Sequence, residues 1–86
     1  MTETIWKFPF RTAHSVHNIP RGAIPLALQV QDGVPTVWMR LEADAPPEQR
    51  SFIVVGTAHT IHPNWIYVGT WQDAPFVFHL FETTTP

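Results

Sequence analysis

The sequence predicts an all-β protein, a small antiparallel sandwich or jelly-roll-like barrel of about seven short strands. Nine prolines separate short runs rich in β-branched and aromatic residues, a spacing that favours short strands over long helices. The dipeptide Asp32-Gly33 stands between two runs that alternate in polarity. Residues 52–55 and 76–81 are bulky and mostly apolar on both faces, which is typical of strands covered on two sides or lying at a subunit contact. We therefore expect packed layers of strands rather than one flat sheet.

Prolines, glycines and polar residues set the expected strand boundaries. The predicted strands, in chain order, cover residues 4–10, 15–19, 26–31, 36–42, 51–56, 65–72 and 76–82. Asp32-Gly33 joins the third and fourth of these, because both central residues of a type I′ hairpin turn need a positive φ. Asp73-Ala74-Pro75 predicts a second hairpin. Residues 43–50 contain Pro46-Pro47 and are expected to form a polar, mobile connector without regular pairing.

The first turn also predicts which side chains share a face of its hairpin. If Gln31 faces Val34, the core side carries three apolar pairs, namely Leu28 with Val37, Leu26 with Met39, and Ile24 with Leu41. The other side carries Gln29 with Thr36, Ala27 with Trp38, and Arg40. Regular pairing is expected to start just after Pro25, which has no N–H to donate.

Length and composition predict one β domain over residues 1–82 and a short flexible tail over residues 83–86. Four Trp and six Phe are difficult to bury together in so small a monomer, so some are expected to face a ligand or another copy of the chain in a homo-oligomer. A formal charge of -2 with scattered cations argues against polymeric nucleic acid as a partner. The absence of cysteine, of a leader pattern and of a long apolar run predicts a cytoplasmic protein with no membrane partner.

The histidines give little support for catalysis or metal binding. They include two His-x-x-His pairs, His14/His17 and His59/His62. Residues three apart in a strand point to opposite faces, and neither pair has an acidic residue nearby to complete a metal site. No metal or other cofactor is therefore expected, and the plainer interpretation is solvated loop histidines with a half-buried His79. Neither serine lies in a nucleophile motif, so no catalytic residue is assigned.

Aromatic and cationic side chains together give the best indication of binding. Trp38 and Arg40 are predicted on the face away from the core, where an indole can stack on a planar base and a guanidinium can bind phosphate. The remaining candidate ligand-binding residues are Lys7, His59, Asn64 and Trp65. The structural alternative is that Trp38 packs in a second layer with Arg40 extended past it, and that Trp65 is a lid over the core.

Five landmarks follow one another along the chain, namely Thr4-Ile5-Trp6-Lys7, Leu28-Gln29-Val30-Gln31-Asp32-Gly33-Val34-Pro35, Gly56-Thr57-Ala58-His59, Tyr67-Val68-Gly69-Thr70 and Phe78-His79-Leu80-Phe81-Glu82. Together they resemble a family of short bacterial and phage-encoded proteins of uncharacterised function. That family commonly has Gly-His-Pro after Gly-Thr, where this chain has Ala58-His59-Thr60. The resemblance implies a compact β fold and a phage or prophage setting, and it implies no catalytic residues.

Three functions are compatible with these observations. The leading hypothesis is a homo-oligomeric protein that binds and sequesters a small anionic, nucleotide-like signalling molecule without catalysis, by analogy with phage proteins that act as sponges for host-defence nucleotides. Its location would be the host cytoplasm if the protein is phage-encoded. The alternative is a protein-interaction module, such as a host-enzyme inhibitor or a minor virion subunit, which would use exposed aromatic residues as hot spots. The third is a small phosphodiesterase that relies on His59 or His62.

Overall fold

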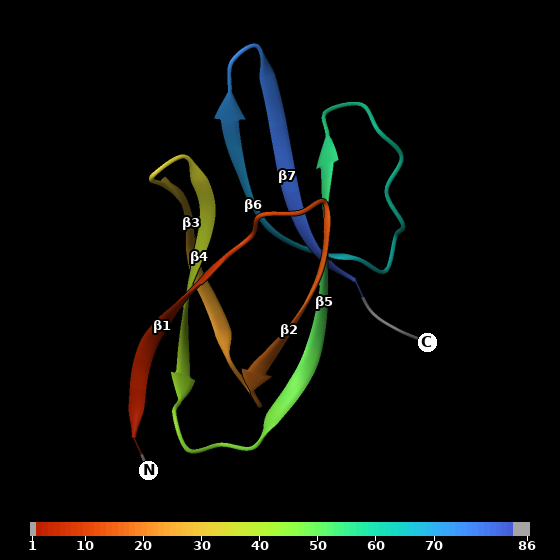
Figure 1. Cartoon of the computed structure of the whole chain (residues 1–86). Helices are drawn as coiled ribbons and strands as arrows, with labels where there is room; N and C mark the ends of the chain where they lie inside the picture. Colours follow the sequence, from red (N-terminus) through yellow and green to blue (C-terminus); the bar gives the residue numbers. More distant parts are fainter. Residues whose placement is uncertain (1, 84–86) are drawn as a thin grey trace.

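The computed structural model of the chain describes residues 2–83, which form seven antiparallel strands in two sheets (Figure 1). The three-stranded sheet has the order β1-β4-β3 and consists of β1 (Glu3–Pro9), β4 (Val34–Glu42) and β3 (Ile24–Gln31). The four-stranded sheet has the order β2-β5-β7-β6 and consists of β2 (His14–Pro20), β5 (Pro47–Gly56), β7 (Phe76–Thr83) and β6 (Ile66–Asp73). The predicted all-β sandwich is confirmed. Among residues 2–83 there is no helix with the length and hydrophobicity needed to cross a membrane.

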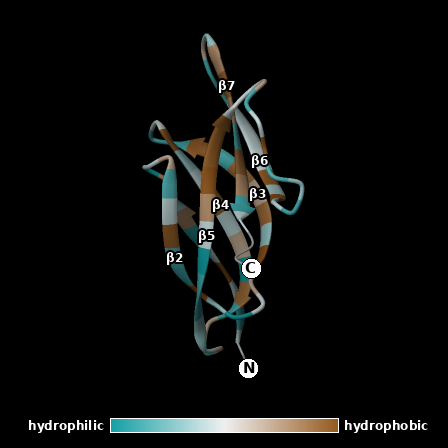
Figure 2. Ribbon diagram, turned by 90° about the vertical axis from the view of Figure 1, so that its right-hand side faces the viewer, coloured by the Kyte–Doolittle hydropathy of each residue, from teal (hydrophilic) through white to brown (hydrophobic). Residues whose placement is uncertain are grey.

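One hydrophobic core lies between the two sheets. Val37, Met39 and Leu41 alternate along β4 and are at most 3% exposed, and they pack with Phe52 of β5 and Leu80 of β7. Alternation along these strands fixes the inner face of each sheet, because successive side chains point to opposite sides. Figure 2 shows the hydrophobic upper length of β5 and its hydrophilic lower end. All seven predicted strands are present, and both runs predicted to be covered on two sides belong to β5 and β7 inside the four-stranded sheet.

The hairpin between β3 and β4 confirms the predicted turn and part of the predicted register. Asp32 and Gly33 have φ values of 52° and 78°, as a type I′ turn requires. The predicted pairs of Gln31 with Val34, Leu28 with Val37, Gln29 with Thr36 and Ala27 with Trp38 are all present.

The register predicted beyond Ala27 is wrong. A bulge lies between Pro25 and Ala27, so Met39 faces Pro25 instead of Leu26, and Ile24 faces Arg40 instead of Leu41. Pro25 cannot donate a ladder hydrogen bond, and an extra residue next to it lets the pairing resume. As a result Ile24 and Leu26 are more than half exposed instead of lying in the core.

The predicted connector over residues 43–50 is also partly wrong, because its second half is a strand. β5 begins at Pro47, which pairs with Pro20, and Arg50 pairs with His17. A proline is tolerated as the first residue of a strand because its missing N–H lies at the end of the ladder. Only residues 43–46 connect β4 to β5. Thr83 belongs to β7, and the rest of the predicted tail, residues 84–86, lies outside the described residues.

The two sheets approach each other closely at one edge, and a buried ion pair joins β5 to β7 within the four-stranded sheet. At the β3 and β6 edges the backbones come so close that a Cβ atom on Gly69 would lie 2.7 Å from the Cβ of Leu28. At the end of the molecule away from the Asp32-Gly33 turn, Arg50 binds Glu82 through two hydrogen bonds of 2.6 and 2.7 Å and donates a third to the carbonyl of Ala23. The hydrogen bonds with Glu82 raise the pKa of Arg50. This largely buried pair closes one end of the sandwich and leaves the other end open.

Candidate binding site at the open end of the sandwich

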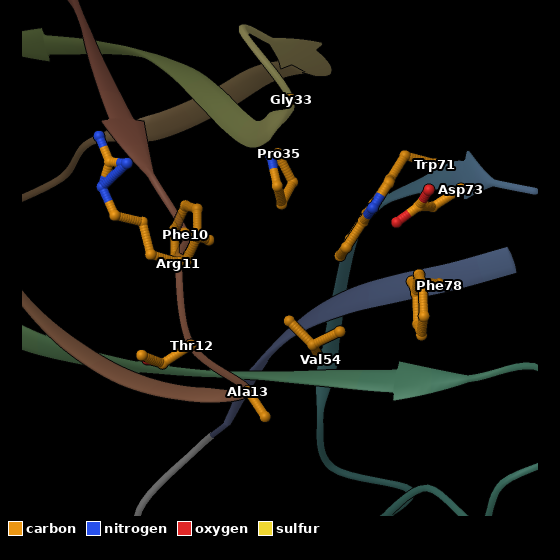
Figure 3. Close-up of a pocket in the computed structure, with 10 residues that line it drawn as sticks. All are labelled: Phe10, Arg11, Thr12, Ala13, Gly33, Pro35, Val54, Trp71, Asp73 and Phe78. Atoms are coloured by element: carbon orange, nitrogen blue, oxygen red, sulfur yellow. The ribbon is translucent and has the colours of Figure 1, made fainter. Parts of the chain in front are cut away.

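Three connecting segments lie toward the open end, where the β6–β7 hairpin projects beyond the other two (Figure 1). They are residues 10–13 between β1 and β2, the Asp32-Gly33 turn between β3 and β4, and the hairpin turn that follows Asp73 (Figure 1). Antiparallel strands alternate in direction, so connections that are far apart in the sequence come to the same end of a sandwich. Between them lies a pocket of about 250 Å³, which we call the end pocket (Figure 3). It is lined by Phe10, Arg11, Thr12, Ala13, Gly33, Pro35, Val54, Trp71, Asp73 and Phe78.

Residues 10–13 are held in place by hydrogen bonds to both sheets. The N–H of Phe10 donates to the carbonyl of Pro35 at 2.9 Å, and the N–H of Val54 donates to the carbonyl of Ala13 at 2.8 Å. Since Pro35 belongs to β4 and Val54 to β5, this segment spans the gap between the sheets. The side chain of Arg11 is thereby carried by a segment that is fixed at both ends.

Aromatic rings form much of the inner wall of the end pocket. Phe10 is 2% exposed and packs edge-on against Phe52, with ring centroids 4.9 Å apart. On the opposite wall Trp71 and Phe78 are paired across β6 and β7, and their rings lie 5.7 Å apart with a tilt of 35°. Figure 3 shows Val54 and Pro35 between these two aromatic walls. The pocket therefore offers an apolar lining suited to a flat ring.

Two charged side chains border the end pocket. Figure 3 shows the carboxylate of Asp73 beside Trp71, whereas the guanidinium of Arg11 is directed away from Trp71 and Phe78. Within residues 2–83 neither Arg11 nor Asp73 makes a side-chain hydrogen bond or ion pair. Both groups are therefore available to a ligand.

A second hollow of about 220 Å³ adjoins the end pocket, and we call it the outer pocket. It is lined by Lys7, Pro9, Arg11, Gln31, Asp32, Val34 and Thr36. The Nζ of Lys7 donates to the Oε1 of Gln31 at 2.7 Å, which holds the ammonium group at this hollow. Arg11 lines both pockets, so the two lie on either side of this residue. Two cations against the single carboxylate of Asp32 give the outer pocket a net positive charge.

The predicted binding residues Lys7, Trp38 and Arg40 lie together on the outer face of the three-stranded sheet. Trp38 pairs with Lys7 on one side and with Ala27 on the other, and it is half-buried. Arg40 binds the carboxylate of Glu3 at 2.7 Å, and this hydrogen bond lowers the pKa of Glu3 below its usual value. Of these three residues, only Lys7 lines the outer pocket.

The other predicted residues, His59, Asn64 and Trp65, lie on the connection between β5 and β6. Trp65 packs at 6.2 Å from the ring of Phe81, which faces outward because its neighbour Leu80 is in the core. The N–H of Asn64 donates to the Nδ1 of His62 at 3.1 Å. Trp65 and Trp38 are thus on opposite outer faces of the sandwich, and the structure does not bring the six predicted residues into one site.

His59 lines a third hollow, of about 500 Å³, with Phe76 and Phe78. His79 is half-buried as predicted, and its two ring nitrogens lie 2.8 Å from the hydroxyls of Thr57 and Thr70. In the part of the chain that the structure describes, no group of three or more His, Asp or Glu side chains is arranged to hold a metal ion.

Sequence reasoning missed Arg11, Trp71 and Asp73 as site residues. Trp71 was placed in the correct strand, and Asp73 in the correct turn, but no pattern in the sequence says that this turn meets residues 10–13 and the Asp32-Gly33 turn. One signal was present: each of the three residues lies within two positions of a predicted turn or strand end, where binding residues concentrate.

The molecule is therefore a small seven-stranded β-sandwich domain whose open end carries an aromatic pocket beside a cationic one. The full chain, residues 1–86, matches the family described as "Domain of unknown function (DUF7352)", and the chain belongs to this family. No curated protein matches the chain, and no solved structure matches it.

Proposed function

We propose that this protein binds a small anionic ligand with a planar ring, such as a nucleotide, at the open end of the sandwich and does not turn it over. The observation that carries the proposal is the position of Arg11. It has no partner among residues 2–83 and stands between an aromatic pocket and a pocket that also holds Lys7. A ring in the end pocket and a phosphate in the outer pocket would both be within reach of this residue.

The sizes of the pockets support a ligand that is divided between them. Sites for drug-sized ligands are usually about 300–1,000 Å³. The end pocket and the outer pocket, at about 250 and 220 Å³, each fit only part of such a ligand. Together they suit a molecule with one ring system and one anionic group.

The lining residues support binding rather than catalysis. In the described chain none of the five histidines lines either pocket, and His59 and His62 lie on the connection between β5 and β6. This arrangement does not favour the phosphodiesterase hypothesis, which needs a histidine next to the ligand. In the phage setting that the sequence resemblance implies, a protein that binds without turnover would sequester a signalling nucleotide.

Calorimetry with AMP, GMP, CMP, UMP and inorganic phosphate tests the proposal. We expect at least one nucleotide to bind more tightly than phosphate alone, and chromatography afterwards to recover it intact. Arg11→Ala should weaken binding about tenfold or more, because hydrogen bonds to charged groups contribute about 1.5–3 kcal/mol. Arg21→Ala is the matched control, since Arg21 lies at the other end of the sandwich near Glu48. Failure of every nucleotide to bind, or recovery of cleaved products, would contradict the proposal.

The outer face of the three-stranded sheet favours a second candidate, a protein-interaction module. Ile5 and Ile24 flank Arg40 on this face and are 55% and 58% exposed, with Trp38 next to them. Exposed apolar groups around a charged residue are typical of interface hot spots. Native mass spectrometry tests self-association at this face, where Ile24→Asp should dissociate an oligomer and leave nucleotide binding unchanged.

A further inference from the structure

The unpaired carboxylate of Asp73 restricts the kind of ring that the end pocket can accept. This inference rests on the proposed function, and it concerns the chemistry of the ring rather than of the anionic group. A carboxylate that a ligand covers loses its hydration, so it must receive hydrogen bonds from that ligand. A ligand that is itself anionic adds repulsion, which makes such hydrogen bonds more necessary.

The position of Asp73 along β6 brings it within reach of a ring on Trp71. The two residues are two positions apart and therefore project from the same face of the strand, about 7 Å from each other. Trp71 and Asp73 pair with Phe78 and Phe76 of β7, and Figure 3 shows the carboxylate beside the indole. The edge of a ring that lies against Trp71 can therefore meet the carboxylate.

An ionised carboxylate only accepts hydrogen bonds, and its two oxygens can accept from two parallel donors. A guanine ring offers two adjacent N–H donors, from its ring nitrogen and its exocyclic amino group, in that arrangement. Adenine offers an amino group next to a ring nitrogen that is an acceptor, and uracil offers one N–H between two carbonyl oxygens. Of these three rings, guanine alone satisfies both oxygens without placing an acceptor against them.

We propose that the end pocket selects a guanine-type ring, and that Asp73 accepts the two adjacent N–H donors of that ring. Arg11 and Lys7 bind the anionic group of the same ligand in the outer pocket. Asp73 is then the residue that determines specificity, while the two cations provide affinity for any nucleotide.

Calorimetry with GMP, IMP, XMP and AMP tests the inference. GMP should bind about tenfold more tightly than AMP, and IMP should be weaker than GMP because it lacks the exocyclic amino group. Asp73→Asn should weaken GMP binding about tenfold and improve binding of XMP, because the amide can donate to the carbonyl that replaces this amino group. Asp44→Asn, in the connection between β4 and β5, is the matched control and should change neither affinity.

The outcomes separate this inference from the proposed function. AMP or UMP binding as tightly as GMP, or GMP binding that survives Asp73→Asn, would overturn the guanine preference and leave the binding function standing. If no nucleotide binds the intact protein, both are overturned. A thermal unfolding midpoint for Asp73→Asn close to that of the unchanged protein ensures that a loss of GMP binding does not reflect unfolding.

Discussion

Ala58 has a backbone conformation that is unusual for a residue with a side chain. Its φ is 74°, in the left-handed region, where a Cβ atom is unfavourable by about 1–2 kcal/mol. Glycine has no Cβ atom and would have no such penalty at this position. The alanine side chain therefore strains the backbone at position 58.

We predict that Ala58→Gly stabilises the protein by about 0.5–1 kcal/mol. The gain is less than the full penalty because glycine also makes the unfolded chain more flexible. Urea unfolding measures the change. Ala45→Gly is the control and should destabilise slightly, since Ala45 is not among the described residues with positive φ. A loss of stability in Ala58→Gly similar to that in Ala45→Gly would show that the backbone at position 58 is not strained.

The partly buried ring of His17 makes the stability of the protein depend on pH. Its ring lies 4.6 Å from that of Phe10 and 5.7 Å from that of Phe52, and burial lowers its pKa below the usual value. The unfolded chain keeps the usual pKa of about 6.5, so it binds a proton more readily than the folded protein does. The free energy of unfolding therefore has its full value above about pH 6.5. It decreases as the pH falls through the lower pKa of His17 in the folded state.

We predict that the urea midpoint falls between pH 7.5 and pH 5, and that His17→Gln makes this fall shallower even if its stability at pH 7.5 is lower. Titration of the His17 ring by NMR provides an independent check. Equal pH dependence in the variant and the unchanged protein would contradict the role assigned to His17.

At the level of the elements, the close approach of β3 and β6 depends on Gly69. Because the Cβ of Leu28 would be only 2.7 Å from a Cβ at position 69, the backbones themselves must move to accept a larger residue. The bulge between Tyr67 and Gly69 lies at the same place in β6. These features make the edge between the two sheets intolerant of small changes in volume.

We predict that Gly69→Ala destabilises the protein by about 1–3 kcal/mol, the usual range for overpacking. Gly56→Ala is the matched control. Its nearest neighbour would be the ring of His59 at 3.4 Å, a loop side chain that can move, so little loss is expected. Chemical unfolding of the two variants gives the comparison, and equal losses in both would rule out the clash with Leu28 as the cause.

The strands and turns also show which parts of the fold the sequence predicts and which it does not. The strands and both hairpins were predictable, because Asp32-Gly33, the prolines and the alternation of side chains act locally. The bulge next to Pro25 was not predictable. A strand can accommodate a proline either by losing one ladder hydrogen bond or by forming a bulge with an extra residue. The strand character of residues 47–50 depends on pairing with β2, a contact that no local pattern encodes.

At the level of the whole molecule, the arrangement of the two sheets determines which residues come together in the candidate site. From the sequence, Trp38 and Trp65 were joined in one site because their residue types suit a nucleotide, but the two-sheet arrangement places them on opposite faces. The same arrangement brings Arg11, Trp71 and Asp73 to the end pocket. Residue types were thus predictable, whereas their grouping follows from sheet order and strand direction. The largely buried Arg50–Glu82 pair lies at the other end of the sandwich.

Backbone amide NMR during titration with GMP tests the central claim most directly, because it reports binding and its location together. We predict that the largest shifts occur at Arg11, Thr12, Gly33 and Asp73, around the end pocket. Residues 57–65 and the strand positions around Arg40, which line neither of these two pockets, should change little. Shifts concentrated in either of those two regions, or no shifts at millimolar GMP, would contradict the account.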